Sequence, residues 1–168
     1  DRERFLHNID TQSARLAAMI DKMLALASVE HRQSLENVEP VDMAAVAAEA
    51  VAAIEPRLGR KHLRIDCSFD PAPAIVVGDR FLLGQALANL LDNAVDFSPQ
   101  AAAIEVELRS QGKSVLLRVS DGGPGIPDFA HDRIFDRFYS LPRPDGSRSS
   151  GLGLSFVREV AALHGGSA

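Results

Sequence analysis

The N-terminal part of the chain carries a heptad repeat without proline or glycine over residues 1–34. One heptad position is occupied by Phe5, Gln12, Met19 and Leu26, and the other by Ile9, Leu16 and Met23. Such an a/d seam predicts one long, coiled-coil-like helix. A single helix buries too little surface to be stable alone, so we expect the seam to favour self-association. The alternative is a helix that lies on its own domain.

Residues 35–168 combine helical and strand periodicities. Helical patterns cover about residues 42–60, 81–98 and 152–163, with Asp42 and Asp79 as N-caps. Alternating patterns predict strands at 63–69 and 75–77, a hairpin of 103–109 with 114–120, and a linker or edge strand at 35–41. This mixture predicts an α+β domain, a two-layer α/β sandwich with helices on one face of a mixed sheet. The inner face of the last helix is predicted at Leu154, Val157, Val160 and Ala161.

Composition narrows the function classes. The 168 residues are 46% hydrophobic, enough for one core and an appendage, and the net charge of -5 argues against a nucleic-acid surface. The most apolar run, residues 43–54, contains Glu49 and is too short to cross a bilayer. We therefore expect this segment to contact neither nucleic acid nor membrane. The single Cys67 lies in a predicted strand, which indicates a core thiol and a reducing compartment.

Two glycine clusters mark the C-terminal part of the chain. Asp121-Gly-Gly-Pro-Gly-Ile-Pro and Ser149-Ser-Gly-Leu-Gly-Leu bracket residues 128–148, which we call the lid. Glycine lets the backbone approach a ligand closely, and a helix that begins at a glycine turn directs free N–H groups at an anion. This pattern favours a lid over a nucleotide. Two ordinary loops are the simpler alternative.

The helix predicted at residues 81–98 carries two asparagines on one face. Asn89 and Asn93 are four residues apart, so their amides point in the same direction. Their carbonyl oxygens suit a hard cation such as Mg²⁺, which completes its coordination with phosphate and water oxygens. On an isolated helix, two surface amides would be the default interpretation. Their position before the two glycine clusters favours the metal.

Four segments in this order resemble the conserved boxes of sensor histidine kinases. They are residues 85–99 (the N box), 121–125 (the G1 box), 134–139 (the F box) and 151–154 (the G2 box). The N-terminal helix is similar to the second helix of the dimerisation and histidine-phosphotransfer hairpin, which would make residues 1–34 a partial domain and residues 35–168 the catalytic domain. Asp96-Phe-Ser-Pro and Phe138-Tyr-Ser-Leu-Pro-Arg look most like CreC-type sensors.

The resemblance implies a Bergerat-type fold with a site for ATP and Mg²⁺. Asn93 would be the Mg²⁺ ligand, and Asn89 beside it would help to hold the metal and the phosphates as a second catalytic residue. Asp121 would accept a hydrogen bond from the adenine amino group. The other implied ATP-binding residues are Gly123, Gly125 and Ile126 at the base, Phe138 with Phe135 as lid anchors, and Ser150, Gly151, Leu152, Gly153 and Leu154 at the phosphates.

The implied activity is that of a protein-histidine kinase. It would transfer the ATP γ-phosphoryl group to a histidine on a helix missing from this chain, and thence to the receiver domain of a response regulator. Since the chain begins at Asp1 rather than Met, we expect a cytoplasmic piece of a longer, homodimeric protein in the inner (plasma) membrane.

Three features depart from the family pattern. The acceptor motif, a histidine followed by an acidic residue and soon by Thr-Pro, is absent, so this chain alone has no phosphoryl acceptor. Ser149 occupies the position of a frequent glycine, and Asp96 that of the usual cation. Either Asp96 turns outward or lid cations compensate for it, and we favour compensation. The candidate cations are Arg137, Arg143 and Arg148.

Two other functions remain open, an ATPase of the gyrase, chaperone and mismatch-repair group and a degenerate nucleotide-binding scaffold. Those ATPases use a glutamate four residues before the metal-binding asparagine as the general base. Here Asn89 occupies that position, and an amide takes no proton at neutral pH. The sequence therefore favours kinase chemistry.

Overall fold

The chain begins with one long helix and continues as a layer of helices packed on a sheet. The computed structural model describes residues 2–30, 34–143, 146 and 149–168. In chain order the elements are α1 (Arg2–Glu30), β1 (Glu39–Asp42), α2 (Met43–Leu58), the 3-10 turn η1 (Gly59–Lys61), β2 (Arg64–Phe69), β3 (Ile75–Gly78), α3 (Arg80–Phe97), β4 (Ala103–Gln111), β5 (Ser114–Ser120), the 3-10 turn η2 (Asp128–Arg133) and α4 (Gly153–Leu163). All predicted helices and strands occur, and β1 shows that the segment before α2 forms a strand.

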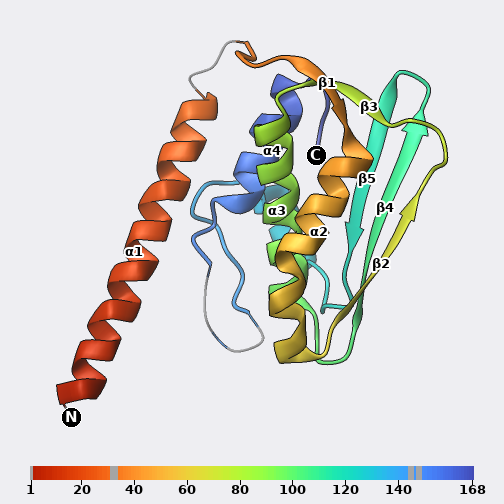
Figure 1. Cartoon of the computed structure of the whole chain (residues 1–168). Helices are drawn as coiled ribbons and strands as arrows, with labels where there is room; N and C mark the ends of the chain where they lie inside the picture. The colour runs from red at the N-terminus through yellow and green to blue at the C-terminus, as the bar shows by residue number, and fades with distance from the viewer. Residues whose placement is uncertain (1, 31–33, 144–145, 147–148) are drawn as a thin grey trace.

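The strands of the described residues form two sheets. β2 pairs in parallel with β4, and β4 pairs antiparallel with β5. β1 and β3 form a separate antiparallel pair. Figure 1 shows α2, α3 and α4 on one face of the larger sheet. The prediction of an α+β sandwich with a mixed sheet is confirmed.

The main core lies between the larger sheet and the helices α2 and α3. Alternate residues of β4, namely Ile104, Val106 and Leu108, are buried in this core, which is the pattern of a strand with one covered face. α3 contributes Leu87 and Leu91, both fully buried. Because α3 is anchored along its length, the polar side chains on its other faces have defined positions.

Hydrogen bonds within the chain's own turns determine where α2 and α3 begin. The side chain of Asp42 accepts a hydrogen bond from the backbone N–H of Ala44 at 2.9 Å. The side chain of Asp79 accepts one from the N–H of Leu82 at 3.1 Å. Both bonds satisfy N–H groups that have no partner inside a helix. The two N-cap predictions are therefore confirmed.

The end of α1 packs on the domain, whereas the rest of this helix projects away from it (Figure 1). Leu26 and Val29 are buried in a second cluster with Phe156 of α4. Nearer the N-terminus, Phe5 is 65% exposed and Leu16 is 60% exposed. The last turns of α1 therefore lie on their own domain, and self-association through the exposed seam stays a prediction. None of the described helices is both long and apolar enough to span a bilayer.

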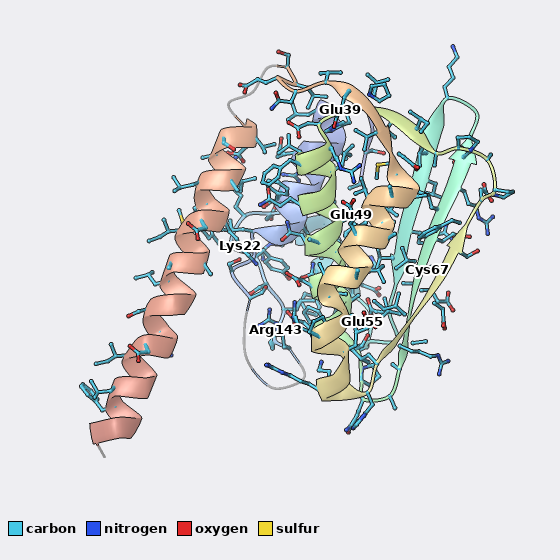
Figure 2. The ribbon with its side chains drawn as sticks, viewed as in Figure 1. Lys22, Glu39, Glu49, Glu55, Cys67 and Arg143 are labelled. Atoms are coloured by element: carbon cyan, nitrogen blue, oxygen red, sulfur yellow. The ribbon has the colours of Figure 1, made fainter. Side chains whose placement is uncertain are left out.

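One prediction of burial is wrong, and one is incomplete. On the predicted inner face of α4, Val157 and Val160 are buried and Leu154 and Ala161 are half-buried, and Phe156, which was not predicted, is buried as well. Cys67 is exposed rather than in the core, because it lies on β2, an edge strand of the larger sheet (Figure 2). Partial burial and, to a smaller extent, the Asp66 carboxylate raise the pKa of the Cys67 thiol.

Candidate functional site

Asn89 and Asn93 lie on α3, beside the start of α4. The Asn89 Nδ2 donates a hydrogen bond to the carbonyl oxygen of Gln85, 3.1 Å away. Its Oδ1 lies 3.2 Å from the position that a Cβ on Gly153 would occupy. The absence of a side chain at Gly153 therefore lets α4 begin directly against the Asn89 amide. Both asparagines line one polar cavity.

This polar cavity has a volume of about 260 Å³ and lies at the N-terminus of α4. Its lining residues are Asn89, Asn93, Ser149, Ser150 and Gly153, together with the charged Lys22, Arg57, Asp92, Asp96 and Arg143. In the described part of the chain, no side chain caps α4 at its N-cap residue Leu152. The first N–H groups of the helix therefore have no helical partner, and they add to the positive end of the helix dipole. Such a cavity suits an anion.

An apolar cavity of about 220 Å³ adjoins the polar one and shares Asn93, Ser149 and Gly153 with it. Its apolar lining residues are Leu90, Ala94, Phe97, Val119, Pro124, Ile126, Ile134, Leu141 and Leu154. Asp121 follows β5 at the edge of this cavity, and its Oδ1 accepts a hydrogen bond from the N–H of Gly123 at 2.8 Å. An apolar space with one oriented carboxylate suits a planar base that carries an amino group.

The lid backbone crosses the second glycine cluster at Gly151. This residue has a φ of +68°, and its carbonyl oxygen accepts a hydrogen bond from the N–H of Phe138 at 2.9 Å. A Cβ at Gly151 would lie 2.5 Å from the carbonyl carbon of Phe138 and 2.6 Å from the carbonyl oxygen of Tyr139. Only glycine permits both this backbone conformation and this close crossing.

A larger groove of about 730 Å³ lies between α2 and α3. Its lining mixes apolar residues such as Val46, Ala50 and Ile54 with charged residues, and no residue of either glycine cluster reaches it. It lacks the paired amides and the helix N-terminus, so the two smaller cavities are the better candidate for a nucleotide.

Residues 78–168, more than half of the chain, match the family described as "Histidine kinase-, DNA gyrase B-, and HSP90-like ATPase". The chain belongs to this family. Sensor protein CreC of Escherichia coli K12 is 44% identical over 97% of this chain, which confirms the predicted resemblance to CreC-type sensors. The chain spans 34% of the length of CreC.

Solved structures of histidine kinases have the same fold. The mycobacterial sensor histidine kinase MprB matches with a TM-score of 0.64 and 34% identity, over 77% of this chain and 81% of that chain. Full-length ShkA in complex with AMPPNP matches with a TM-score of 0.81 and 25% identity, over 97% of this chain and 34% of that chain. The histidine kinase fold therefore extends over α1 as well as the sandwich.

Most residues predicted to bind ATP in this ATPase family line one of the two cavities. Asp121, Gly125, Ile126, Gly151 and Leu154 line the apolar cavity, Asn89 and Ser150 line the polar cavity, and Asn93 and Gly153 line both. Gly123 lies outside the lining, but its N–H orients the Asp121 carboxylate. Leu152 lines neither cavity, because its side chain is buried beneath α4. The roles of these residues toward a ligand stay predictions.

The side chain of Phe138 lies in neither cavity. It is 56% exposed, on a residue with a φ of +62°. The next residue, Tyr139, lines the apolar cavity, and the guanidinium carbon of Arg133 lies 4.4 Å from its ring centroid. Phe135 is half-buried, with the Arg158 guanidinium 5.9 Å from its ring centroid. The backbone N–H of Phe138 and the ring of Tyr139 therefore make the contacts that the sequence assigned to the Phe138 side chain.

Four charged side chains border the polar cavity on the side of α2 and the lid. Arg57 of α2 pairs with Asp92 through Nη1 and with Asp96 through Nη2, the latter at 3.1 Å. Arg143 of the lid pairs with the other oxygen of Asp96 at 2.5 Å. Figure 2 shows Arg143 beside the helical layer. Asp96 is thus compensated by a lid cation, as favoured from the sequence, and by a cation from α2 that the sequence analysis missed.

Arg137, the other candidate lid cation within the described residues, does not line this cavity. Arg137 pairs with Glu30 at the end of α1. Arg148 lies outside the described residues. Arg57 was missed because it is separated from Asp96 by 39 positions, and no local pattern connects the two.

Proposed function

We propose that this chain is the ATP-binding catalytic part of a protein-histidine kinase. It would bind ATP with Mg²⁺ and deliver the γ-phosphoryl group to a histidine outside this chain, and the receiver domain of a response regulator would then accept it. The observation that carries this proposal is the pair of adjoining cavities, one apolar with a carboxylate at its edge and one polar at a helix N-terminus. The structural similarity to ShkA with bound AMPPNP supports an adenine nucleotide as the occupant.

The apolar cavity would hold the adenine base. The Asp121 carboxylate, oriented by the Gly123 N–H, would accept a hydrogen bond from the exocyclic amino group. Ile126 and Leu154 would contact the faces of the base, and Tyr139 would close the cavity from the lid. Because the two cavities share Asn93 and Gly153, a base in one would direct its phosphates into the other.

The polar cavity fits a triphosphate with Mg²⁺. The two amide side chains offer uncharged oxygen ligands, which this hard cation accepts beside phosphate oxygens and water. Asn93 would be the protein ligand of the metal. The Asn89 Nδ2 donates a hydrogen bond to the carbonyl oxygen of Gln85, which fixes the amide so that its Oδ1 is the atom available to the same cavity. When bound, Mg²⁺ would neutralise charge on the phosphate oxygens. The N–H groups at the start of α4 would hold the remaining phosphate oxygens in place.

The site favours phosphoryl transfer over ATP hydrolysis. Hydrolysis needs a general base for water, and Asn89 has an amide where an ATPase would have a carboxylate. The neighbouring Asp92 carboxylate is already engaged in an ion pair with Arg57. Transfer to an external histidine requires positioning and charge stabilisation, and the cavity provides both.

The rest of the proposal concerns the longer protein. α1 would be the second helix of a dimerisation and phosphotransfer hairpin, and its exposed seam would be covered in a homodimer. Residues 1–34 would then be part of that domain and residues 35–168 the catalytic domain. The whole protein would be a membrane sensor with this part on the cytoplasmic side, as the relationship to a sensor protein supports.

Calorimetric titration of ATP with and without Mg²⁺ tests the proposal. We expect Asn93→Ala to lose the Mg²⁺-dependent part of the ATP affinity and to keep the Mg²⁺-independent part, because the change removes one metal ligand and no core contact. Asn37→Ala is the matched control, since this exposed asparagine lies outside both cavities. Equal ATP-Mg²⁺ affinity in the Asn93→Ala variant and the parent would contradict the assignment of the metal site. A parent that binds no ATP would contradict the function itself.

A further inference from the structure

Asp96 places a negative charge where a polyphosphate would bind. It lies on α3, three residues after Asn93, and both side chains line the polar cavity. At about 6 Å and an effective dielectric constant of about 20, the repulsion between two unit charges corresponds to a roughly hundredfold loss of affinity. A site that binds ATP with Asp96 in place therefore needs a cation that acts on the same cavity.

The ion pairs of Asp96 divide the neighbouring arginines into two roles. Arg57 lies on α2 and uses both of its terminal nitrogens, one on Asp92 and one on Asp96. Arg143 lies on the lid and meets the second oxygen of Asp96 at 2.5 Å. If Arg143 turned toward a ligand, Asp96 would keep its ion pair with Arg57. Arg143 is therefore the arginine that can approach a ligand while Asp96 keeps a cationic partner.

The other nearby cations are less suited to this role. Lys61 donates to the carbonyl oxygens of Val95, Asp96 and Ser98 at 2.8, 2.8 and 3.1 Å, so its ammonium group caps the end of α3. Lys22 lines the cavity from α1, as an exposed side chain on a separate helix. Arg143 is only 26% exposed and already lies at the cavity.

Resting on the proposed function, we propose that Arg143 binds the polyphosphate of ATP and that Asp96 is its positioning residue. Asp96 holds the Arg143 guanidinium at the cavity before the nucleotide arrives. Where the family pattern has a cation on α3, this chain has a carboxylate that binds a cation of the lid. The guanidinium has five N–H donors in a planar fork, so it can donate to phosphate oxygens and keep a bond to Asp96.

The test is a double-mutant cycle of Arg143→Ala and Asp96→Lys, followed by calorimetric titration with ATP-Mg²⁺ and, separately, with adenosine. In the parent we expect Arg143→Ala to weaken ATP binding tenfold to a hundredfold and to leave adenosine binding unchanged, because the base cavity is intact. In the Asp96→Lys background the lysine supplies the cation, so the same change should weaken ATP binding less than threefold. Asp96→Lys alone should bind ATP at least as tightly as the parent.

Two further variants keep the test independent of folding defects. Arg118→Ala removes the same charge from β5, at a residue that lines neither cavity and pairs with Glu107, and should leave ATP binding unchanged. Arg143→Lys keeps the charge and should recover part of the lost affinity. Thermal melting of each variant shows that it is folded.

Each outcome decides one part of the proposal. If Arg143→Ala and Arg118→Ala have the same ATP affinity, Arg143 does not bind the polyphosphate. If Arg143→Ala costs as much in the Asp96→Lys background as in the parent, Asp96 does not position it. If adenosine affinity falls with ATP affinity, Arg143 acts on the whole lid. A parent that binds adenosine and no ATP would contradict the proposed function rather than the role of Arg143.

Discussion

Gly151→Ala should open the lid without unfolding the domain. Gly151 has a φ of +68°, and the Cβ of an alanine would lie 2.5, 2.6 and 2.7 Å from three backbone atoms of Phe138 and Tyr139. These are backbone contacts, so no side-chain rotation relieves them. One side of the crossing has to move, and the substitution also strains the backbone of residue 151 itself.

The free-energy cost of Gly151→Ala in the closed-lid structure can be estimated from three effects. A left-handed backbone costs a non-glycine residue about 1–2 kcal/mol. Overlap in a packed region costs about 1–3 kcal/mol, and loss of the hydrogen bond from the Phe138 N–H to the Gly151 carbonyl costs about 1 kcal/mol. Together these amount to about 3–6 kcal/mol, which is comparable with the stability of a small domain. Because the overlap is with the lid and not with the core, separating the lid is the cheaper response.

Two measurements check this prediction. Amide hydrogen exchange at Phe138 should accelerate, because this N–H loses its acceptor in Gly151. The affinity for ATP-Mg²⁺ should fall about a hundredfold, which corresponds to about 3 kcal/mol spent on holding the lid closed. Gly146→Ala is the matched control. Its φ is +78° and no atom of the other described residues lies within 4 Å of the position of its Cβ, so it carries the backbone strain without the overlap.

The reasoning would be refuted if Gly151→Ala and Gly146→Ala showed the same exchange rate at Phe138. It would also be refuted if the Gly151→Ala variant lost its whole thermal transition, since the overlap would then be transmitted to the core. An unchanged ATP affinity together with faster exchange would mean that the closed lid contributes nothing to nucleotide binding.

Three further predictions concern the whole chain. The purified chain should bind ATP without labelling itself, because it lacks the acceptor motif, and acid-labile radiolabel after incubation with γ-labelled ATP would contradict this. The exposed seam of α1 should cause weak, concentration-dependent self-association that Met19→Glu abolishes, and unchanged sedimentation of an associating parent would show the seam to be an intramolecular contact. Since burial and then the Asp66 carboxylate raise the pKa of the Cys67 thiol, its thiolate fraction at about pH 8 is low, and alkylation should be slow there and rise with pH. Asp66→Asn removes one of these causes, lowers the pKa and should speed alkylation at that pH, and equal rates would exclude a role of Asp66.

The parts of the fold that could be predicted depend on short-range interactions. Asp42 and Asp79 were identified as N-caps because a cap bonds N–H groups only two or three residues away. Asn89 and Asn93 were assigned to one face because helical periodicity relates positions four apart. The glycine clusters were assigned to a ligand site because the backbone freedom of glycine is also a local property.

The parts that could not be predicted depend on which distant elements meet. Cys67 alternates like a core residue along β2, and only the strand order makes β2 an edge. The partners of Asp96 come from α2 and from the lid, and no spacing along the chain indicates either contact. The exposure of Phe138 follows from the crossing at Gly151, which joins two segments that the sequence separates by the lid.

The ion pair between Glu30 and Arg137 makes the position of α1 and the state of the lid thermodynamically linked. Arg137 is 55% exposed, so the pair contributes up to about 1 kcal/mol, which is roughly a fivefold change in an equilibrium constant. Such linkage is reciprocal. If nucleotide binding draws the lid away from α1, the equilibrium constant for docking of α1 on the domain falls by some factor, and undocking of α1 changes the nucleotide affinity by the same factor. Glu30→Gln should reduce both effects together, and a change in only one of them would show that the pair does not connect the two.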